Sequence, residues 1–199
     1  MAARTAEKYA KYMFPTVRTL YEEPIVMSRG SGHYLYDEDG KEYLDFFGGI
    51  LTCGIGHANP KVAEAVSKQA HTLQHCSTLY IIPGQVELAE RLLGIVPKGI
   101  SKFTFANSGT EAIEAAILMA QIATGNDEII ALRHSYSGRS KLAIELTALH
   151  NWKQGMAPSG NVKYTHNGYC YRCAFGLGYP SCGMKCAYDL EELIRTSTR

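Results

Sequence analysis

The stretch FTFANSGTEAIEAAI, residues 103–117, joins two segments of different character. Its first residues, Phe103–Phe105, are aromatic or β-branched and predict a buried strand over 102–106. Ser108 then stands where a helix N-cap belongs, and Glu111 follows at the spacing of a capping box. The sequence therefore predicts a strand, a sharp turn on Ser-Gly-Thr, and a buried helix over 109–124.

This turn has two interpretations. A capping box is common to α/β proteins and is then purely structural. Alternatively, the unpaired N–H groups of a helix N-terminus bind an anion, and Gly109 lets the anion approach the backbone closely. Ser108 and Thr110 add hydroxyl donors. The second interpretation predicts a phosphate site, although neither a Walker loop nor a Gly-x-Gly-x-x-Gly motif is present.

A second polar turn follows the next predicted strand, DEIIAL at 127–132. There the sequence RHSYSGRS, residues 133–140, places Tyr136 just before Gly138. We expect the strands 102–106 and 127–132 to be parallel, which brings both turns to one sheet edge. Tyr136 then stacks on a planar ring whose phosphate lies at Ser108 or, in the simpler alternative, covers the core.

The rest of the chain is assigned more coarsely. HYLYDEDGKEYLDFF, residues 33–47, alternates around Asp-Gly and predicts a hairpin. Asn59 and Pro60 begin a helix that continues to Leu73. Further helices are predicted over 85–93, 139–149 and 189–196, and the first of these has a buried stripe. A surface helix is predicted at the N-terminus. Residues 150–187 have little regular pattern. The fold class is α/β.

Composition excludes several classes of partner. The 199 residues carry a net charge of +1, which gives no reason to expect nucleic acid. No apolar run approaches the ~18–20 residues of a membrane span, and no signal-peptide pattern is present. We therefore expect a cytoplasmic protein that contacts no membrane and whose six cysteines are reduced.

Four of these cysteines are closely spaced in CYRCAFGLGYPSCGMKC, residues 170–186. Each half of the Cys-x2-Cys-x8-Cys-x3-Cys pattern has the spacing of metal ligands, and one shared ion predicts converging sulfurs. The favoured alternative is that these thiols are inert or labile to oxidation and bind no metal. The candidate ligands are Cys170, Cys173, Cys182 and Cys186.

Three blocks carry a family resemblance: DFFGGILTCGIGHANPKV at 45–62, FANSGTEAIEAAI at 105–117 and HSYSGRS at 134–140. In this order and spacing they resemble the N-terminal half of class III pyridoxal-phosphate aminotransferases, similar to alanine–glyoxylate and 4-aminobutyrate aminotransferases. The resemblance implies part of a fold-type I large domain, with a parallel-dominated sheet covered by helices on both faces. An N-terminal α+β segment, residues 1–58, would precede this incomplete domain, residues 59–199.

The resemblance also implies site residues. The cofactor would be pyridoxal 5'-phosphate, with its phosphate held by Ser108, Gly109 and Thr110 and its ring stacked on Tyr136. Ile50 would line the substrate entrance, and His57 is interpreted as a hydrogen-bonded structural residue. Ser137 departs from the family, which often has His there. A homodimer is implied for the full-length enzyme, as are an amino donor and a keto-acid or aldehyde acceptor.

No catalytic residue is expected within these 199 residues. The lysine that forms the Schiff base, and the aspartate that pairs with the pyridinium nitrogen, would follow the last residue. The chain is therefore expected to be an N-terminal fragment of a transaminase, inactive by itself. Two alternatives remain open at this point: a non-catalytic or split-protein half, and a lyase or aminomutase of the same fold.

Overall fold

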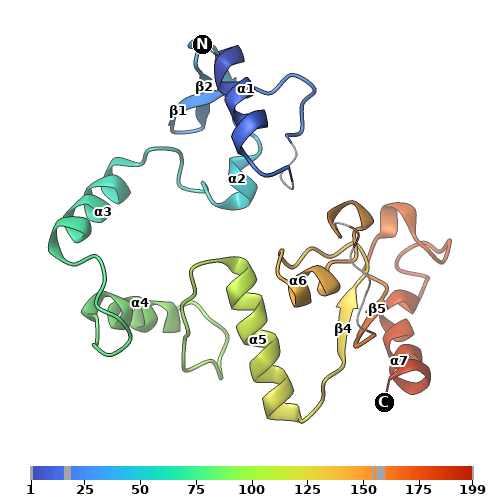
Figure 1. The fold of residues 1–199 in the computed structure, drawn as a ribbon. Coiled ribbons are helices and arrows are strands. Elements are labelled where there is room, and N and C mark those ends of the chain that lie inside the picture. The colour runs from blue at the N-terminus through green and yellow to red at the C-terminus, as the bar shows by residue number, and fades with distance from the viewer. Residues whose placement is uncertain (1, 16–18, 154, 156–159, 199) are drawn as a thin grey trace. The chain divides into compact units, whose positions relative to one another are not determined.

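The computed structural model describes residues 2–15, 19–153, 155 and 160–198 (Figure 1). The chain divides into two compact units, Met1–Gly94 and Ile95–Arg199, and each is described by itself. Within the described residues, no helix is both long enough and apolar enough to cross a membrane.

The first unit contains a small antiparallel sheet. After helix α1 (Ala2–Tyr12), the strands β1 (Met27–Ser31), β2 (Tyr34–Asp37) and β3 (Glu42–Leu44) pair in the order β1-β2-β3. The Asp37 carboxylate holds the turn between β2 and β3, because its Oδ1 accepts the N–H groups of Asp39 at 3.0 Å and Lys41 at 2.9 Å. Gly40 supplies the positive φ of +83° that this turn requires. The predicted hairpin is confirmed.

Three helices follow in the same unit. A short turn, α2 (Gly48–Leu51), precedes α3 (Pro60–Thr72) and α4 (Pro83–Leu93). Asn59 caps α3 by accepting the Lys61 N–H at 3.1 Å, as predicted, and both longer helices have proline in their first turn. The predicted buried stripe of α4 is wrong: none of its side chains is buried, and Val86 and Leu93 are exposed. An amphipathic stripe identifies the apolar face, but burial also requires a surface to cover it.

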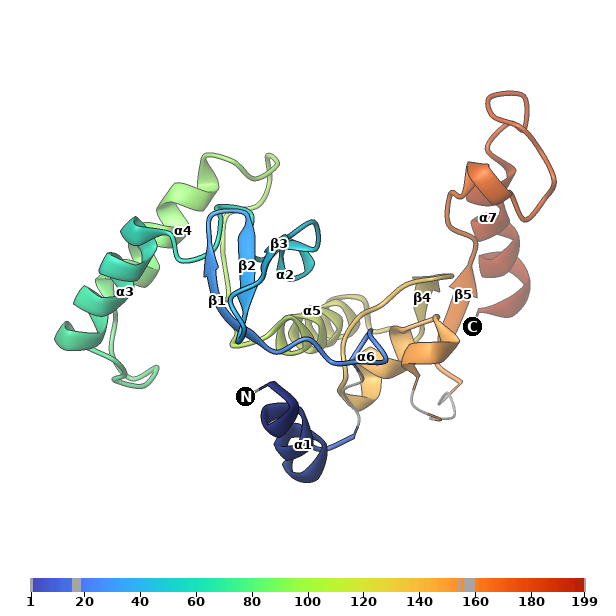
Figure 2. The same ribbon diagram turned by 90° about the horizontal axis from the view of Figure 1, so that it is seen from above.

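The second unit is built around a parallel strand pair. Its elements are α5 (Gly109–Thr124), β4 (Ile129–Leu132), α6 (Lys141–Leu146), η1 (His150–Trp152), β5 (Val162–Thr165), η2 (Cys170–Arg172) and α7 (Lys185–Ser197). β4 and β5 run parallel, with Ile129 opposite Val162 and Leu132 opposite Thr165. Figures 1 and 2 show these strands side by side and α7 next to β5. The strand–helix–strand order is that of a βαβ unit.

Two strand predictions in this unit are corrected. Residues 102–106 form no strand, so the expected pairing of 102–106 with 127–132 is absent. The parallel partner of β4 is instead β5, which lies in the region assigned no regular pattern. The alternation in VKYT, the four residues of β5, is too short to identify a strand from sequence. The aromatic run at 102–106 would form a strand only if another strand accepted its hydrogen bonds.

The helices predicted in this unit are present, but burial and bounds differ: α6 begins at Lys141 rather than 139, and α7 begins at Lys185 rather than 189. α5 begins after Ser108 as expected, yet none of its side chains is buried. α6 ends at Leu146, three residues early, where the Thr147 N–H still bonds to the carbonyls of Ala143 and Ile144. The buried apolar side chains of the described residues gather around α6 and β5; they are Ala143, Ile144, Leu146 and Val162.

This small core makes a testable prediction. Ile144 is 5% exposed whereas Ile122, on α5, is 74% exposed. Ile144→Ala should lower the free energy of unfolding by about 2–5 kcal/mol, because it leaves a cavity. Ile122→Ala, the same change at an exposed helical position, should stay within about 0.5 kcal/mol of wild type. Urea unfolding followed by circular dichroism measures both, and equal losses would contradict the assignment of the core.

Candidate cofactor and substrate sites

The first turn of α5 has the capping box that the sequence predicts. Ser108 is extended, with φ −148° and ψ 160°, and its Oγ accepts the Glu111 N–H at 3.2 Å. The Glu111 carboxylate reaches one residue further back than the cap, and its Oε2 accepts the Asn107 N–H at 2.7 Å. This pair of hydrogen bonds fixes where the helix begins and satisfies one of its terminal donors. The N–H groups of the first turn that no cap takes point outward along the helix axis.

Gly109 leaves open space at this helix end. A Cβ built on Gly109 would meet nothing within 4 Å, so the space beside the backbone is free for a ligand. Thr110 is half-buried, and its Oγ1 accepts the Arg139 N–H at 3.3 Å, which leaves the hydroxyl proton available for a further partner. Helix polarity, open space and two hydroxyl groups together fit a phosphate group.

The loop after β4 packs directly on this turn. Gly138 has a φ of +134°, and a Cβ there would lie well inside van der Waals contact of Thr110 Oγ1 and 3.0 Å from Ala143 Cβ. Two residues later, the Ser140 hydroxyl donates to Glu114 of α5 and also caps α6. The backbone approaches α5 this closely only because residue 138 has no side chain.

Tyr136 stands in the same loop and is held from both sides. The Ser135 hydroxyl donates to the Leu146 carbonyl at 2.7 Å, and the Ser137 N–H donates to Thr147 Oγ1 at 3.0 Å. Tyr136 itself is 52% exposed and meets Trp152 edge-to-face, with ring centroids 5.7 Å apart and planes at 70°. Its backbone is therefore anchored while its ring keeps exposed surface.

Sequence reasoning missed Thr147 and Trp152 at this site. Thr147 is fully buried, and its hydroxyl donates to the Ala143 carbonyl at 2.9 Å while accepting from Ser137. It thereby links the end of α6 to the Tyr136 loop. A threonine after a helix and the single tryptophan of the chain carry no motif, so only their position in the fold reveals these contacts.

The segment that carries Ile50 belongs to the first unit and is organised by Asp45. Asp45 Oδ1 accepts the N–H groups of Phe47 and Gly48, both at 2.9 Å, and Oδ2 lies 2.7 Å from His57 Nε2. The hydrogen bond to His57, followed by the one from the Gly48 N–H, lowers the pKa of Asp45. The structure thus confirms His57 as a hydrogen-bonded residue.

Two glycines allow His57 to reach this position. Gly32 and His57 exchange backbone hydrogen bonds of 3.0 and 2.7 Å, and a Cβ on Gly30 would lie 2.7 Å from the His57 Cβ. Residues 48–50 follow Asp45 in a left-handed turn, in which Ile50 has φ 59° and is 74% exposed. A β-branched residue is strained in this region, and such strain is a feature of ligand-binding segments.

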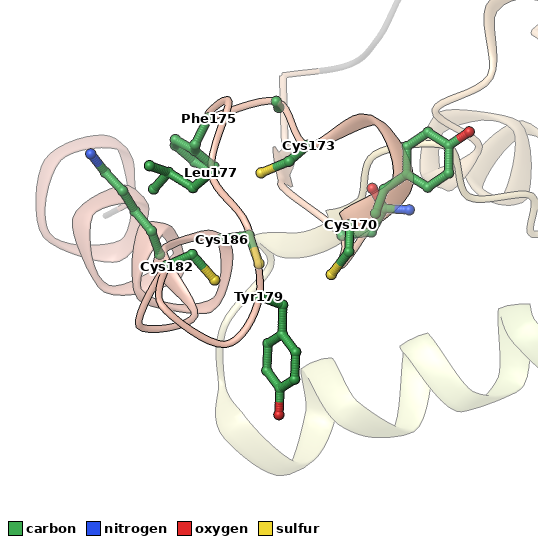
Figure 3. Close-up of a pocket in the computed structure, with 11 residues that line it drawn as sticks. Cys170, Cys173, Phe175, Leu177, Tyr179, Cys182 and Cys186 are labelled. Atoms are coloured by element: carbon green, nitrogen blue, oxygen red, sulfur yellow. The ribbon is translucent and has the colours of Figure 1, made fainter.

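The four clustered cysteines line one cavity of the second unit (Figure 3). All four are free thiols, and only Cys170 is exposed. Among the residues that the structure describes, no group of three or more His, Cys, Asp or Glu side chains is arranged to hold a metal ion. The convergence expected for a four-thiolate metal site is therefore not found there.

Comparison with known proteins identifies the family. The sequence model of the aminotransferase class-III family matches residues 17–174, well over half of the chain. The chain belongs to the class-III aminotransferase family. Members of this family depend on pyridoxal 5'-phosphate, and the solved transaminases that resemble this class-III chain have the fold-type I architecture, which confirms the fold class.

Individual relatives agree with this assignment. The chain is 36% identical over 191 residues to alanine–glyoxylate aminotransferase 2 homolog 2 of Arabidopsis thaliana. The aligned residues are 96% of this chain and 39% of that protein. It is 41% identical over 142 residues to an acetylornithine aminotransferase of Methanothermobacter thermautotrophicus, covering 71% of this chain and 36% of the relative. The class-III chain thus spans about two fifths of these curated relatives.

A solved structure gives the same result. An (S)-enantioselective omega-transaminase from Thermomicrobium roseum superposes with a TM-score of 0.85 at 29% identity, over 98% of this chain and 46% of that one.

The close approach at Gly138 makes a second prediction. Gly138→Ala should lower the free energy of unfolding by about 1–3 kcal/mol, because its Cβ collides with Thr110 and its φ disfavours L-residues. Gly168→Ala is the matched control: nothing lies within 4 Å of a Cβ there, and we expect a change within about 0.5 kcal/mol. Chemical denaturation tests both variants. If Gly138→Ala is neutral, this loop does not depend on a missing side chain.

The lowered pKa of Asp45 leads to a prediction about pH dependence. Its pKa is lowered below the ordinary 3.8, so the stability it contributes is present above about pH 4 and is lost as pH falls through the folded pKa. Asp45→Asn should therefore speed amide hydrogen exchange at Phe47 and Gly48 at neutral pH, and the difference from wild type should shrink in acid. An exchange difference that does not depend on pH would contradict this role.

Proposed function

We propose that this chain contributes the cofactor-phosphate site and part of the substrate entrance of a pyridoxal-phosphate-dependent transaminase. The observation that carries the proposal is the start of α5, where the capped helix end, the open space at Gly109 and the packed Tyr136 loop meet. A phosphorylated aromatic ligand matches this combination, because one turn suits the phosphate and the adjacent loop offers a ring.

Each residue has a defined task in this proposal. The free N–H groups of the first turn of α5 and the hydroxyl groups of Ser108 and Thr110 bind the phosphate, while Gly109 leaves room for it. Tyr136, turned by its anchored backbone, packs against the cofactor ring. When bound, pyridoxal 5'-phosphate supplies the electron sink for moving an amino group from an amino acid or amine to a keto acid or aldehyde.

The substrate side of the proposal rests on residues 45–57. Asp45 accepts two N–H groups and pairs with His57, which holds the left-handed turn at 48–50 in place. Ile50 then presents an apolar side chain to the substrate, and its strained backbone is kept by these contacts. We propose Ile50 as a contact of the substrate entrance on this basis.

Assembly into a homodimer belongs to the same proposal. Apolar side chains remain exposed on α5 and α4, among them Leu118, Met119, Ile122, Val86 and Leu93. Faces of this kind are typical of surfaces that another chain or domain covers. A cytoplasmic location stays a prediction, because relatives such as the Arabidopsis thaliana protein are named mitochondrial.

A matched pair of variants at Ser108 tests the phosphate site. Aspartate and asparagine are both good N-caps, so Ser108→Asp and Ser108→Asn should each preserve α5. The aspartate places a carboxylate against the phosphate dianion and should weaken pyridoxal 5'-phosphate binding by about tenfold or more. The asparagine should stay within about threefold of wild type. Equilibrium dialysis measures both, with unphosphorylated pyridoxal as the ligand control.

Equal binding by the two variants would contradict a phosphate at Ser108. The activity is tested separately, by mixing the chain with a polypeptide that carries the C-terminal half of a class-III aminotransferase and assaying amino transfer. We expect turnover in the wild-type mixture and its loss with Ser108→Asp. Turnover that survives Ser108→Asp would show that another site binds the cofactor.

A further inference from the structure

The cysteine-lined cavity is separate from the residues proposed to bind cofactor and substrate. Its walls include Cys170, Cys173, Cys182 and Cys186 together with Phe175 and Leu177, and its volume is about 30 Å³. That space holds about one water molecule, so it admits a small oxidant but no metabolite. Four free thiols thus line one small space.

Two arms of the chain supply these thiols. Cys170 and Cys173 belong to η2 and the turn that follows it, whereas Cys182 lies in the turn before α7 and Cys186 in the first turn of α7. Figure 3 shows Cys173 on one side of the cavity and the sulfur atoms of Cys182 and Cys186 on the other. A disulfide between the arms would tie the turn after η2 to the start of α7.

Cys173 differs from the other cysteines in its surroundings. The backbone N–H groups of Leu177 and Phe175 stabilise its thiolate and lower the pKa of the thiol, and the Gly176 N–H donates to the Cys173 carbonyl at 3.1 Å. The turn folds back in this way because Gly176 has a φ of +65°. N–H groups that stabilise a thiolate make it the better nucleophile at neutral pH, and Cys173 is only half-buried.

We propose that this cavity is a site of reversible thiol oxidation, in which Cys173 reacts first and a thiol of the second arm, Cys182 or Cys186, completes a disulfide. The oxidant is a hydroperoxide. The Cys173 thiolate attacks the terminal oxygen, the O–O bond breaks, and the sulfenic acid of Cys173 forms as the alkoxide takes a proton to leave as alcohol or water. The second thiol loses its proton and attacks the Cys173 sulfur, the S–O bond breaks, and the hydroxide that leaves takes up a proton to become water. Two thiols are oxidised and one peroxide is reduced.

The disulfide is mapped first in the wild-type chain. The protein is treated with one equivalent of hydrogen peroxide, remaining thiols are blocked with iodoacetamide, and peptides are analysed by mass spectrometry. We expect one disulfide from Cys173 to Cys182 or Cys186, which dithiothreitol reverses. Cys53 and Cys76, free thiols outside this cavity, should stay alkylated and serve as internal controls. A Cys170–Cys173 bond, or no disulfide, would overturn the proposal.

Reactivity is measured without oxidant. Cys173 should react with iodoacetamide about tenfold faster than Cys53 and Cys76 in the same sample. Cys173→Ser should abolish the disulfide, whereas Cys170→Ser, the matched change in the same arm, should leave it. The wild-type rates decide the question even if Cys173→Ser fails to fold. Equal alkylation rates, or one zinc ion retained per purified chain, would show that these thiols are inert or metal-bound.

Discussion

The contact between the Gly138 backbone and the side chain of Thr110 is the constraint on which the second unit depends. It brings the loop after β4 against the first turn of α5, where the Arg139 N–H also finds Thr110 Oγ1 at 3.3 Å. Without this approach, the turn at Ser108 and the ring of Tyr136 would belong to two unrelated loops. Because Gly138 has no side chain, the two parts of the proposed cofactor site can pack against each other.

Each unit has a sharp turn whose backbone N–H groups are accepted by side chains, and the two turns differ in how this is done. Backbone N–H groups at a sharp turn need acceptors. At α5 the side chains of Ser108 and Glu111 accept one N–H each, whereas at residues 45–48 the Asp45 carboxylate accepts two and also pairs with His57. The first arrangement suits a binding site, and the second suits a rigid support for the exposed Ile50.

The family assignment and the burial pattern belong together. The class-III chain covers 46% of the Thermomicrobium roseum transaminase with a TM-score of 0.85, so its elements are those of the larger fold. The described residues nevertheless bury few side chains, and the apolar faces of α4 and α5 stay exposed. An amphipathic pattern marks the apolar face of a helix but does not supply the layer that buries it, which is why such patterns overestimate burial in this chain.

The sequence by itself determined the local structure: the hairpin around Asp-Gly, the Asn59 and Ser108 caps, and the helices that begin after them. These features depend on residues within a few positions of one another, and their chemistry is visible in a short window. It also determined the family, because three motifs in fixed order are specific. Only the tertiary structure decided that β5 rather than 102–106 pairs with β4, that Thr147 and Trp152 hold the Tyr136 loop, and that four cysteines share one cavity. Each of these depends on residues that are far apart in the chain or carry no motif, and strand pairing in particular is settled by which partner can accept the hydrogen bonds.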